Sequence, residues 1–273
     1  MAVALPVPMP LPHPHLPHVP PIWRESRFGL ELAALRRSPV WRGEEVPWGA
    51  GRPVLLIPGF LAGDGSLATM TAWLRRNGYR TSRAGIRSNI GCSEEACGKL
   101  EERLEQLALR YEQPVAIVGQ SRGGLFAKAL ASRRPDLVSG IVTLGSPLKN
   151  MFAVHPLVLA QIGLLGTLGT LGTRPGLLSM RCLKGECCSR FRDALAGAFP
   201  EDVGYLSIYS RSDGIVNWRA CLDPEAGEHV EVVSSHCGMS VNAAAYAATA
   251  QALASFGEGL GDWAAGVEFA QAA

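Results

Sequence analysis

Short hydrophobic runs, many of them β-branched, alternate with longer amphipathic stretches along most of the chain. The runs predict strands at 54–57, about 79–86, 115–118, 138–144, 205–209 and 230–233. The amphipathic stretches predict helices at 23–37, 66–77, 93–111, 122–134 and 241–256. Hydrophobic strands separated by helices are typical of a parallel sheet covered on both faces. We therefore predict an α/β fold with a mostly parallel central sheet.

The first 22 residues follow a different pattern. Prolines recur every few positions and no Lys or Arg occurs before residue 24, so neither a hydrophobic helix nor a standard secretory signal is expected. We predict a flexible Pro/His-rich arm over 1–22, and we treat its histidines, His13, His15 and His18, as part of that arm. Without a standard signal the default location is cytoplasmic, while a secreted or cell-surface location stays open.

Residues 150–173 contain no Asp, Glu, Lys or Arg and repeat Leu, Gly and Thr. A transmembrane span of this length is conceivable, but it would separate the candidate catalytic residues described below onto opposite sides of a bilayer. A hydrophobic lid or cap over about 150–203 fits better, and such a surface suits an acyl-chain substrate and transient contact with a lipid surface. An ordinary buried helix pair is the alternative.

Composition adds limits to this picture. The chain has 273 residues, of which 47% are hydrophobic, and this is enough for one large domain, which we place at 23–273. The formal net charge is only +2, so nucleic acid is not an expected partner. Five of the seven cysteines form two close groups, Cys92/Cys97 and Cys182/Cys187/Cys188, which suggest local bridges. They lack the paired knuckles of a zinc site, so we predict no metal.

The segment 119–123 holds the only G-x-S-x-G pattern in the sequence, with Ser121 at its centre. It follows a predicted strand and opens a predicted helix, which is the context that a nucleophilic serine requires. The tight turn exposes the serine, and the N-terminus of the following helix favours developing negative charge. We predict that Ser121 is a nucleophile.

A nucleophilic serine needs a base to accept its proton. His236 lies in the loop between the last predicted strand and the last long helix, whereas His155 falls in the predicted lid and His229 at the start of a strand. Because catalytic groups gather at the carboxyl ends of parallel strands, His236 is the predicted base. Asp213 follows strand 205–209 directly and is the predicted acid, with Asp223 as the reserve choice.

The negative charge on the attacked carbonyl needs two hydrogen-bond donors. We predict the backbone N–H of Arg122, next to the nucleophile, and that of Phe60, in the turn after strand 54–57. The Arg122 side chain could lie near the acyl pocket or point away from it, and we interpret it as a charge on the helix surface. Because Cys221 and Cys237 follow the acid and the base, a bridge between these two loops is a further hypothesis.

Together, the segments 57–60, 119–123, 209–216 and 235–239 resemble the bacterial lipase/esterase branch of the α/β-hydrolase superfamily. The resemblance covers roughly 54–256 and implies the α/β-hydrolase fold and carboxylic ester hydrolysis through an acyl-enzyme, with no cofactor. The expected partner is a small-molecule or lipid ester substrate. The chain departs from the pattern at Pro58, where these lipases usually have histidine, and at the residues that flank Ser121.

Other functions use the same residues. An acyltransferase or a thioesterase would share the triad and the acyl-enzyme and would differ only in the acceptor or the leaving group. A non-catalytic binding protein on the hydrolase fold is a third possibility, although binding alone needs no such set of residues.

Overall fold

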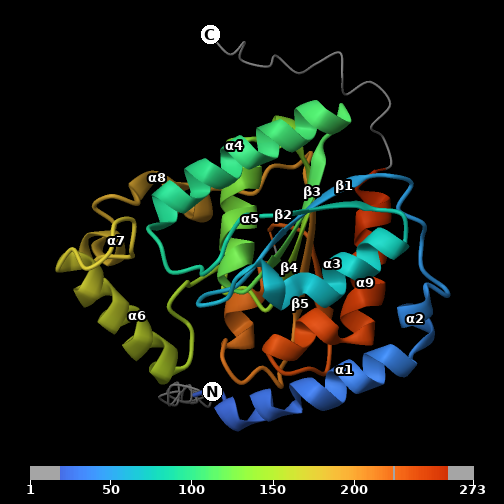
Figure 1. Ribbon diagram of the computed structural model, residues 1–273, viewed down its shortest axis with the longest axis horizontal. Coiled ribbons are helices and arrows are strands. Elements are labelled where there is room, and N and C mark those ends of the chain that lie inside the picture. Colours follow the sequence, from blue (N-terminus) through green and yellow to red (C-terminus); the bar gives the residue numbers. More distant parts are fainter. Residues whose placement is uncertain (1–18, 224, 258–273) are drawn as a thin grey trace, which may run out of the picture.

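A single parallel sheet forms the centre of the molecule (Figure 1). The structure, a computed structural model, describes residues 19–223 and 225–257, so residues 1–18 of the predicted arm and its three histidines lie outside the described residues. The strand order is β2-β1-β3-β4-β5-β6, and each neighbouring pair is parallel. The strands are β1 (Pro53–Ile57), β2 (Arg80–Arg83), β3 (Val115–Gln120), β4 (Val138–Leu144), β5 (Gly204–Tyr209) and β6 (Glu228–Glu231). The prediction of a parallel α/β sheet is confirmed.

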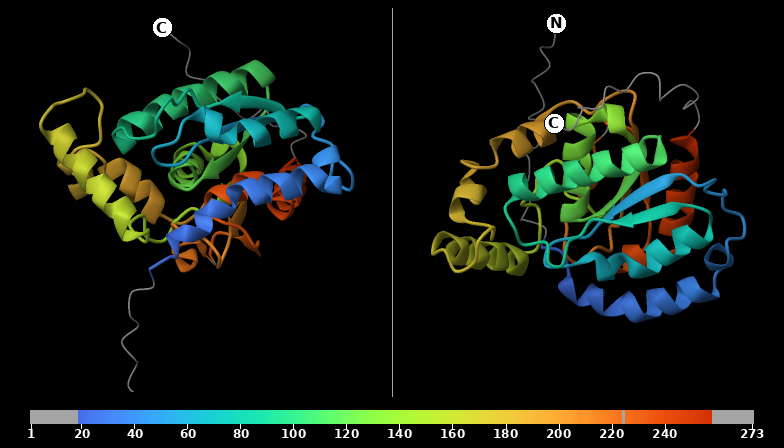
Figure 2. Two further views of the ribbon diagram at one scale, coloured as in Figure 1. Left: turned by 60° about the horizontal axis from the view of Figure 1, so that its bottom comes forward. Right: turned by 45° about the horizontal axis from the view of Figure 1, so that its top comes forward.

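Helices cover both faces of the sheet (Figures 1 and 2). The α-helices are α1 (Phe28–Arg37), α2 (Pro39–Arg42), α3 (Ala68–Arg76), α4 (Ser93–Tyr111), α5 (Arg122–Arg133), α6 (Pro156–Thr170), α7 (Met180–Lys184), α8 (Ser189–Ala196) and α9 (Ala243–Ser255). Short 3-10 helices are η1 (Ile22–Arg27), η2 (Asp64–Leu67), η3 (Pro135–Leu137), η4 (Trp218–Cys221) and η5 (Cys237–Val241). The predicted helix over 93–111 is confirmed at both bounds.

Two hydrophobic cores lie on opposite sides of the sheet because successive strand side chains point to opposite faces. Leu55 and Ile57 of β1 pack with the buried residues of α4, α5 and α8. Val54 and Leu56 pack on the other face with those of α1, α3 and α9. Every residue of β1 and β3 is buried, which explains why the central strands are continuous hydrophobic runs in the sequence.

The outer strands are less predictable. The hydrophobic run at 230–233 predicts the last strand, but β6 lies at Glu228–Glu231 and is half exposed, as is β2 at the opposite edge. An edge strand has a neighbour on one side only and is partly open to water, so its pairing is not marked by a buried run. Val232, just after β6, is buried in the core but lies outside the ladder.

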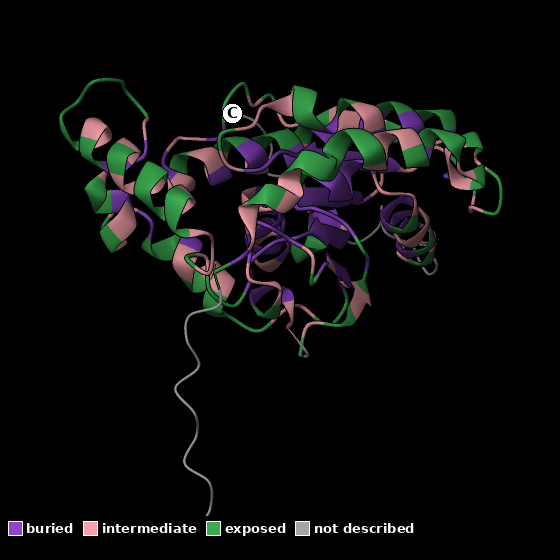
Figure 3. Ribbon diagram, turned by 90° about the horizontal axis from the view of Figure 1, so that it is seen from below, coloured by how far each residue is buried: buried purple, intermediate pink, exposed green. Residues whose placement is uncertain are grey.

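An insertion between β4 and β5 carries α6, α7 and α8 and extends to one side of the sheet (Figures 1 and 2). Figure 3 shows that α6 and α7 are mostly exposed or half buried, in contrast to the buried sheet. Large hydrophobic side chains of α6 face solvent, among them Leu157 and Leu164. No helix in the described ranges is both long and hydrophobic enough to cross a membrane.

Candidate active site

Ser121 occupies a sharp turn between β3 and α5. Its φ is +52° and its ψ is −118°, a conformation that an L-residue adopts only at a cost of about 1–3 kcal/mol. The neighbouring glycine explains how the turn can be so tight: a Cβ atom on Gly123 would lie 2.1 Å from the carbonyl oxygen of Ile57. The turn therefore presents the Ser121 side chain at the carboxyl end of the sheet, beside the end of β1.

His236 and Asp213 form a buried pair. The Nδ1 atom of His236 lies 2.7 Å from Oδ2 of Asp213, and their side chains are 7% and 1% exposed. Oδ1 of the same carboxylate accepts hydrogen bonds from the backbone N–H groups of Ile215 and Val216, each at 2.7 Å. Both carboxylate oxygens of Asp213 are therefore committed, and the orientation of the carboxylate is fixed.

The electrostatics of the pair favour a protonated imidazole. Burial alone would lower the pKa of His236, but the charge and hydrogen bond of Asp213, with a contribution from Glu25, outweigh it and raise the pKa above its ordinary value. The imidazole is thus a stronger base than a free histidine. This is the direction that a proton acceptor near neutral pH requires.

One pocket of about 340 Å³ joins the predicted residues. Ser121 and His236 line it together with Phe60 and Arg122. Among the described residues, the Ser121 hydroxyl and His236 line the same pocket but form no hydrogen bond with each other. The hydrogen bond between a nucleophile and its base is often long when no substrate is bound. The backbone N–H groups of Phe60 and Arg122 have no acceptor among the described residues, so both remain available to a ligand.

The Arg122 side chain does not lie on the helix surface, so that interpretation is wrong. Its guanidinium donates hydrogen bonds to the carbonyl oxygens of Asn89 and Gly91 and to Oγ of Ser93, at 2.7–3.0 Å. Burial lowers the pKa of Arg122 to about 10, so the group is still a cation at neutral pH. The acceptors compensate for the loss of water around this charge, and they lie on the loop that leads into α4.

Two glutamates of the N-terminal helices bind the loops that carry Asp213 and His236. The carboxylate of Glu25, in η1, accepts from the backbone N–H groups of Gly214, His236 and Cys237 at 2.8–3.0 Å, and so connects the loop of Asp213 to that of His236. Glu31, in α1, accepts from Ser234 Oγ and from the N–H and Oγ of Ser235. Sequence analysis missed both residues, because nothing near them in the chain marks these long-range contacts.

The rejected candidates lie elsewhere. His155 precedes α6, and its Nδ1 accepts from the N–H of Leu157. His229 lies in β6, where its Nε2 accepts from the N–H of Asp223. The reserve acid, Asp223, forms an ion pair with Lys128 at 3.0 Å. Asp223, His155 and His229 therefore have structural partners in the described part of the chain.

The cysteines do not pair as the sequence suggests. Cys221 and Cys237 are free, one buried and the other exposed, so the predicted bridge between the catalytic loops is absent from the structure. The suggested local pairing of Cys92 with Cys97 is wrong as well. Cys92 instead contacts Cys187 and Cys188, which come from the insertion.

Solved structures with the same arrangement of strands and helices identify the fold. No family model matches the sequence. A lipase of Bacillus licheniformis in its mature form is similar, with a TM-score of 0.56 and 18% identity over 77% of this chain and 94% of that chain. A soluble variant of monoglyceride lipase from Saccharomyces cerevisiae has a TM-score of 0.55 and 16% identity, over 77% and 90%. The monoacylglycerol lipase of Paleococcus ferrophilus has a TM-score of 0.53 and 16% identity, over 77% and 97%. The chain therefore has the α/β-hydrolase fold that its motifs predict.

Proposed function

We propose that this protein is a serine hydrolase that cleaves carboxylic esters through an acyl-enzyme. Ser121 is the nucleophile, His236 the base and Asp213 the acid. One observation carries the proposal: His236, which pairs with the buried Asp213 at 2.7 Å, lines the same pocket as Ser121, a serine held in a strained turn. A fold needs neither the strain nor the buried charge pair, and both are typical of catalytic sites.

Acylation begins when the Ser121 hydroxyl attacks the ester carbonyl carbon. Its proton passes to Nε2 of His236, while the Asp213 carboxylate accepts a hydrogen bond from Nδ1–H and stabilises the imidazolium that forms. The carbonyl oxygen becomes negative and accepts from the free N–H groups of Phe60 and Arg122. The intermediate then collapses: the bond to the alcohol breaks, the alcohol takes the proton from His236, and the acyl group stays on Ser121.

Deacylation repeats these steps with water. His236 takes a proton from the water as it attacks the acyl carbon, and the same two N–H groups stabilise the second oxyanion. The proton then returns to Ser121 as the acid leaves. No external cofactor is needed to balance either half of the reaction.

The pocket favours a hydrophobic acyl group. Its volume is about 340 Å³, at the small end of ligand sites. Side chains of the core and of the insertion line it jointly, and most are hydrophobic; they include Leu61, Leu125, Met151, Phe152, Val158, Ile162, Leu178, Leu183 and Phe191. We therefore propose the insertion as a cap over the acyl site, in line with the predicted lid.

Substitution of the nucleophile tests the proposal. Ser121→Ala is expected to abolish p-nitrophenyl ester hydrolysis and labelling by a fluorophosphonate probe, because the proposed acyl-enzyme forms on the Ser121 hydroxyl. Ser255→Ala, at an exposed serine near the end of α9, is the matched control and should keep both activities. Full labelling and turnover in Ser121→Ala, with an unchanged circular dichroism spectrum, would disprove the assignment.

Ester chain length tests the substrate class. Each buried methylene contributes about 0.8 kcal/mol, so kcat/KM should rise roughly fourfold per methylene until the pocket is full. A flat profile from acetate to octanoate would contradict an acyl site in this pocket. Adding an alcohol or a thiol as a competing acceptor, and measuring its acylated product, separates a hydrolase from a transferase.

A further inference from the structure

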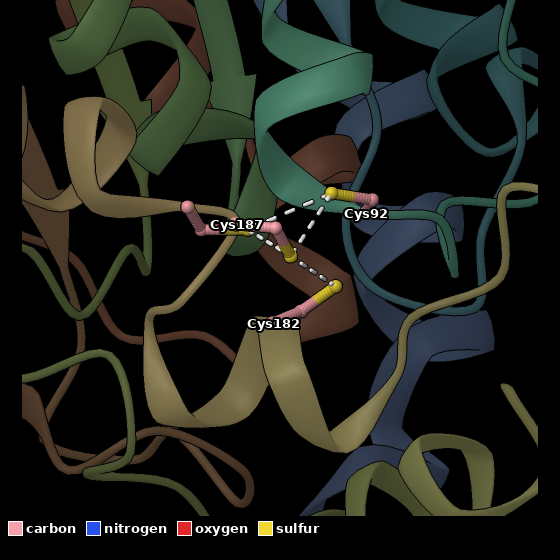
Figure 4. Close-up of side chains that lie close together, drawn as sticks. Cys92, Cys182 and Cys187 are labelled. Atoms are coloured by element: carbon pink, nitrogen blue, oxygen red, sulfur yellow. Dashed lines mark hydrogen bonds between the residues drawn. The ribbon is translucent and has the colours of Figure 1, made fainter. Parts of the chain in front are cut away.

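Four cysteines from distant parts of the chain meet at the junction of the insertion and the core. Cys92 precedes α4, Cys182 lies in α7, and Cys187 and Cys188 lie in the turn that leads into α8. Their sulfur atoms all lie within 4.8 Å of one another. Figure 4 shows the side chains of Cys92, Cys182 and Cys187 pointing toward one another from the two segments. We refer to these four residues as the cysteine cluster.

The spacing of the sulfur atoms is close to that of a tetrahedral metal site. The Sγ–Sγ distances are 3.3 Å for Cys182–Cys187, 3.6 Å for Cys92–Cys188, 3.8 Å for Cys187–Cys188 and 4.0 Å for Cys92–Cys187. With Zn–S bonds of about 2.3 Å, the edges of a tetrahedral zinc site are about 3.8 Å. Two disulfides would bring the sulfurs together in pairs, whereas Cys187 lies at similar distances from three partners. The arrangement is therefore that of metal ligands.

The surroundings suit an anionic metal site. Four thiolates outweigh the charge of one Zn²⁺, so a loaded site needs positive charge and hydrogen-bond donors nearby. The guanidinium of Arg122 binds the segment that carries Cys92, and the acceptors of its hydrogen bonds, the carbonyl oxygens of Asn89 and Gly91 and Oγ of Ser93, are uncharged. Cys92 is the N-cap of α4, where the helix dipole favours a thiolate. Sγ of Cys182 accepts from the backbone N–H of Ser179 at 3.5 Å.

We propose that Cys92, Cys182, Cys187 and Cys188 bind one Zn²⁺ ion that fastens the insertion to the core. Four sulfur ligands leave no open coordination position, so the ion is structural and takes no part in ester chemistry. The cluster reaches the catalytic pocket, because Cys182 and Cys188 line its wall. Other contacts join the same two parts, including the backbone bond from Cys92 N–H to Gly176 O. The ion would therefore fix the cap at the side of the acyl site.

Metal analysis of the full chain is the first test. Protein without a histidine tag, purified under reducing conditions, is expected to contain about one zinc ion per chain when measured by inductively coupled plasma mass spectrometry. Cys187→Ser should reduce the zinc content severalfold or more. Cys97→Ala is the matched control, since Cys97 is buried in α4, the helix that Cys92 caps, and lies outside the cluster. The zinc content of this variant should equal that of the wild type.

A second test needs no variant and so does not depend on whether Cys187→Ser folds. Wild-type protein loaded with Co²⁺ in place of zinc should show the intense visible absorption of tetrahedral thiolate coordination. Wild-type protein free of any metal would overturn the proposal, whether its mass shows two disulfides or all its thiols react freely with iodoacetamide. Iron in place of zinc would overturn the choice of ion. Because none of these measurements uses ester turnover, the zinc site and the proposed function succeed or fail separately.

Discussion

Asp213→Asn probes the proposed triad more sharply than removal of any other side chain, because the structure dictates how the amide must lie. Oδ1 of Asp213 accepts two backbone N–H groups, from Ile215 and Val216. An amide NH₂ cannot replace that oxygen without facing two donors, so the amide oxygen must take the Oδ1 position. The NH₂ group then takes the Oδ2 position, which lies 2.7 Å from Nδ1 of His236.

The consequence is the wrong tautomer. With the amide donating to Nδ1, the imidazole carries its proton on Nε2, the nitrogen that should accept the proton of Ser121. The variant also lacks the negative charge of the Asp213 carboxylate, which would stabilise the imidazolium. In serine hydrolases of this type the loss is about 10⁴-fold in kcat, or roughly 5 kcal/mol of activation free energy. The folded structure should persist, because the hydrogen bonds to Ile215 and Val216 are kept.

The assay compares kcat and KM for p-nitrophenyl butyrate in the wild type, Asp213→Asn and a matched control, Asp223→Asn. The control neutralises the carboxylate that pairs with Lys128 and leaves His236 untouched. We expect the Asp213 variant to lose kcat with little change in KM, and the control to keep kcat within a few fold. Thermal melts establish that both variants are folded.

Two results would refute the reasoning. If folded Asp213→Asn kept its kcat within tenfold of the wild type, the carboxylate would not be the acid of the triad. If Asp223→Asn lost activity instead, the role would pass to the reserve acid.

Three further predictions follow from the site. The acid limb of the kcat/KM pH profile should have its midpoint above the ordinary histidine pKa of about 6.5, because activity needs neutral His236 and the pKa of His236 is raised. A midpoint at or below that pKa contradicts the assignment. Glu25→Gln should move this limb to lower pH because it removes a negative charge near His236. It should also reduce kcat by roughly tenfold, because the amide places a donor where the carboxylate accepted from the Cys237 N–H. An unchanged pH profile would argue for a purely structural role of Glu25. Stripping zinc from the wild type with a chelator should lower Tm by about 2–4 °C for each kcal/mol of binding free energy lost, and zinc should restore it; an unaffected Tm would mean that the cysteine cluster does not support the fold.

The sequence predicts which end of the sheet carries the proposed triad, because the carboxyl ends of parallel strands lie at one edge of a sheet. Ser121 follows β3, Asp213 follows β5 and His236 follows β6. The central strands are buried on both faces and thus stand out as hydrophobic runs, so the loops after them can be located from hydropathy alone. The shift of β6 by two residues did not move His236 from the correct loop.

Contacts between residues far apart in the chain could not be predicted in this way. Glu25 accepts a hydrogen bond from the backbone of His236, which lies 211 residues later in the chain. No periodicity in the sequence indicates a glutamate that binds the backbone of so distant a loop. The expectation of no metal assumed that ligands come in close sequence pairs. The fold brings Cys92 beside Cys187 instead, because the insertion after β4 returns to the start of α4.

Arg122 links the two proposals. Its backbone N–H is a proposed oxyanion donor, and its side chain binds the loop 89–93 that carries Cys92. The start of α5, which would stabilise the oxyanion, and the segment that carries Cys92, a proposed zinc ligand, are therefore held together by one side chain. A bound ion would restrain that loop, and the loop in turn restrains the guanidinium at the pocket wall. Because a solvated surface arginine makes no such contacts, the interpretation of Arg122 as a surface charge missed a side chain that connects the start of α5 to the loop of Cys92.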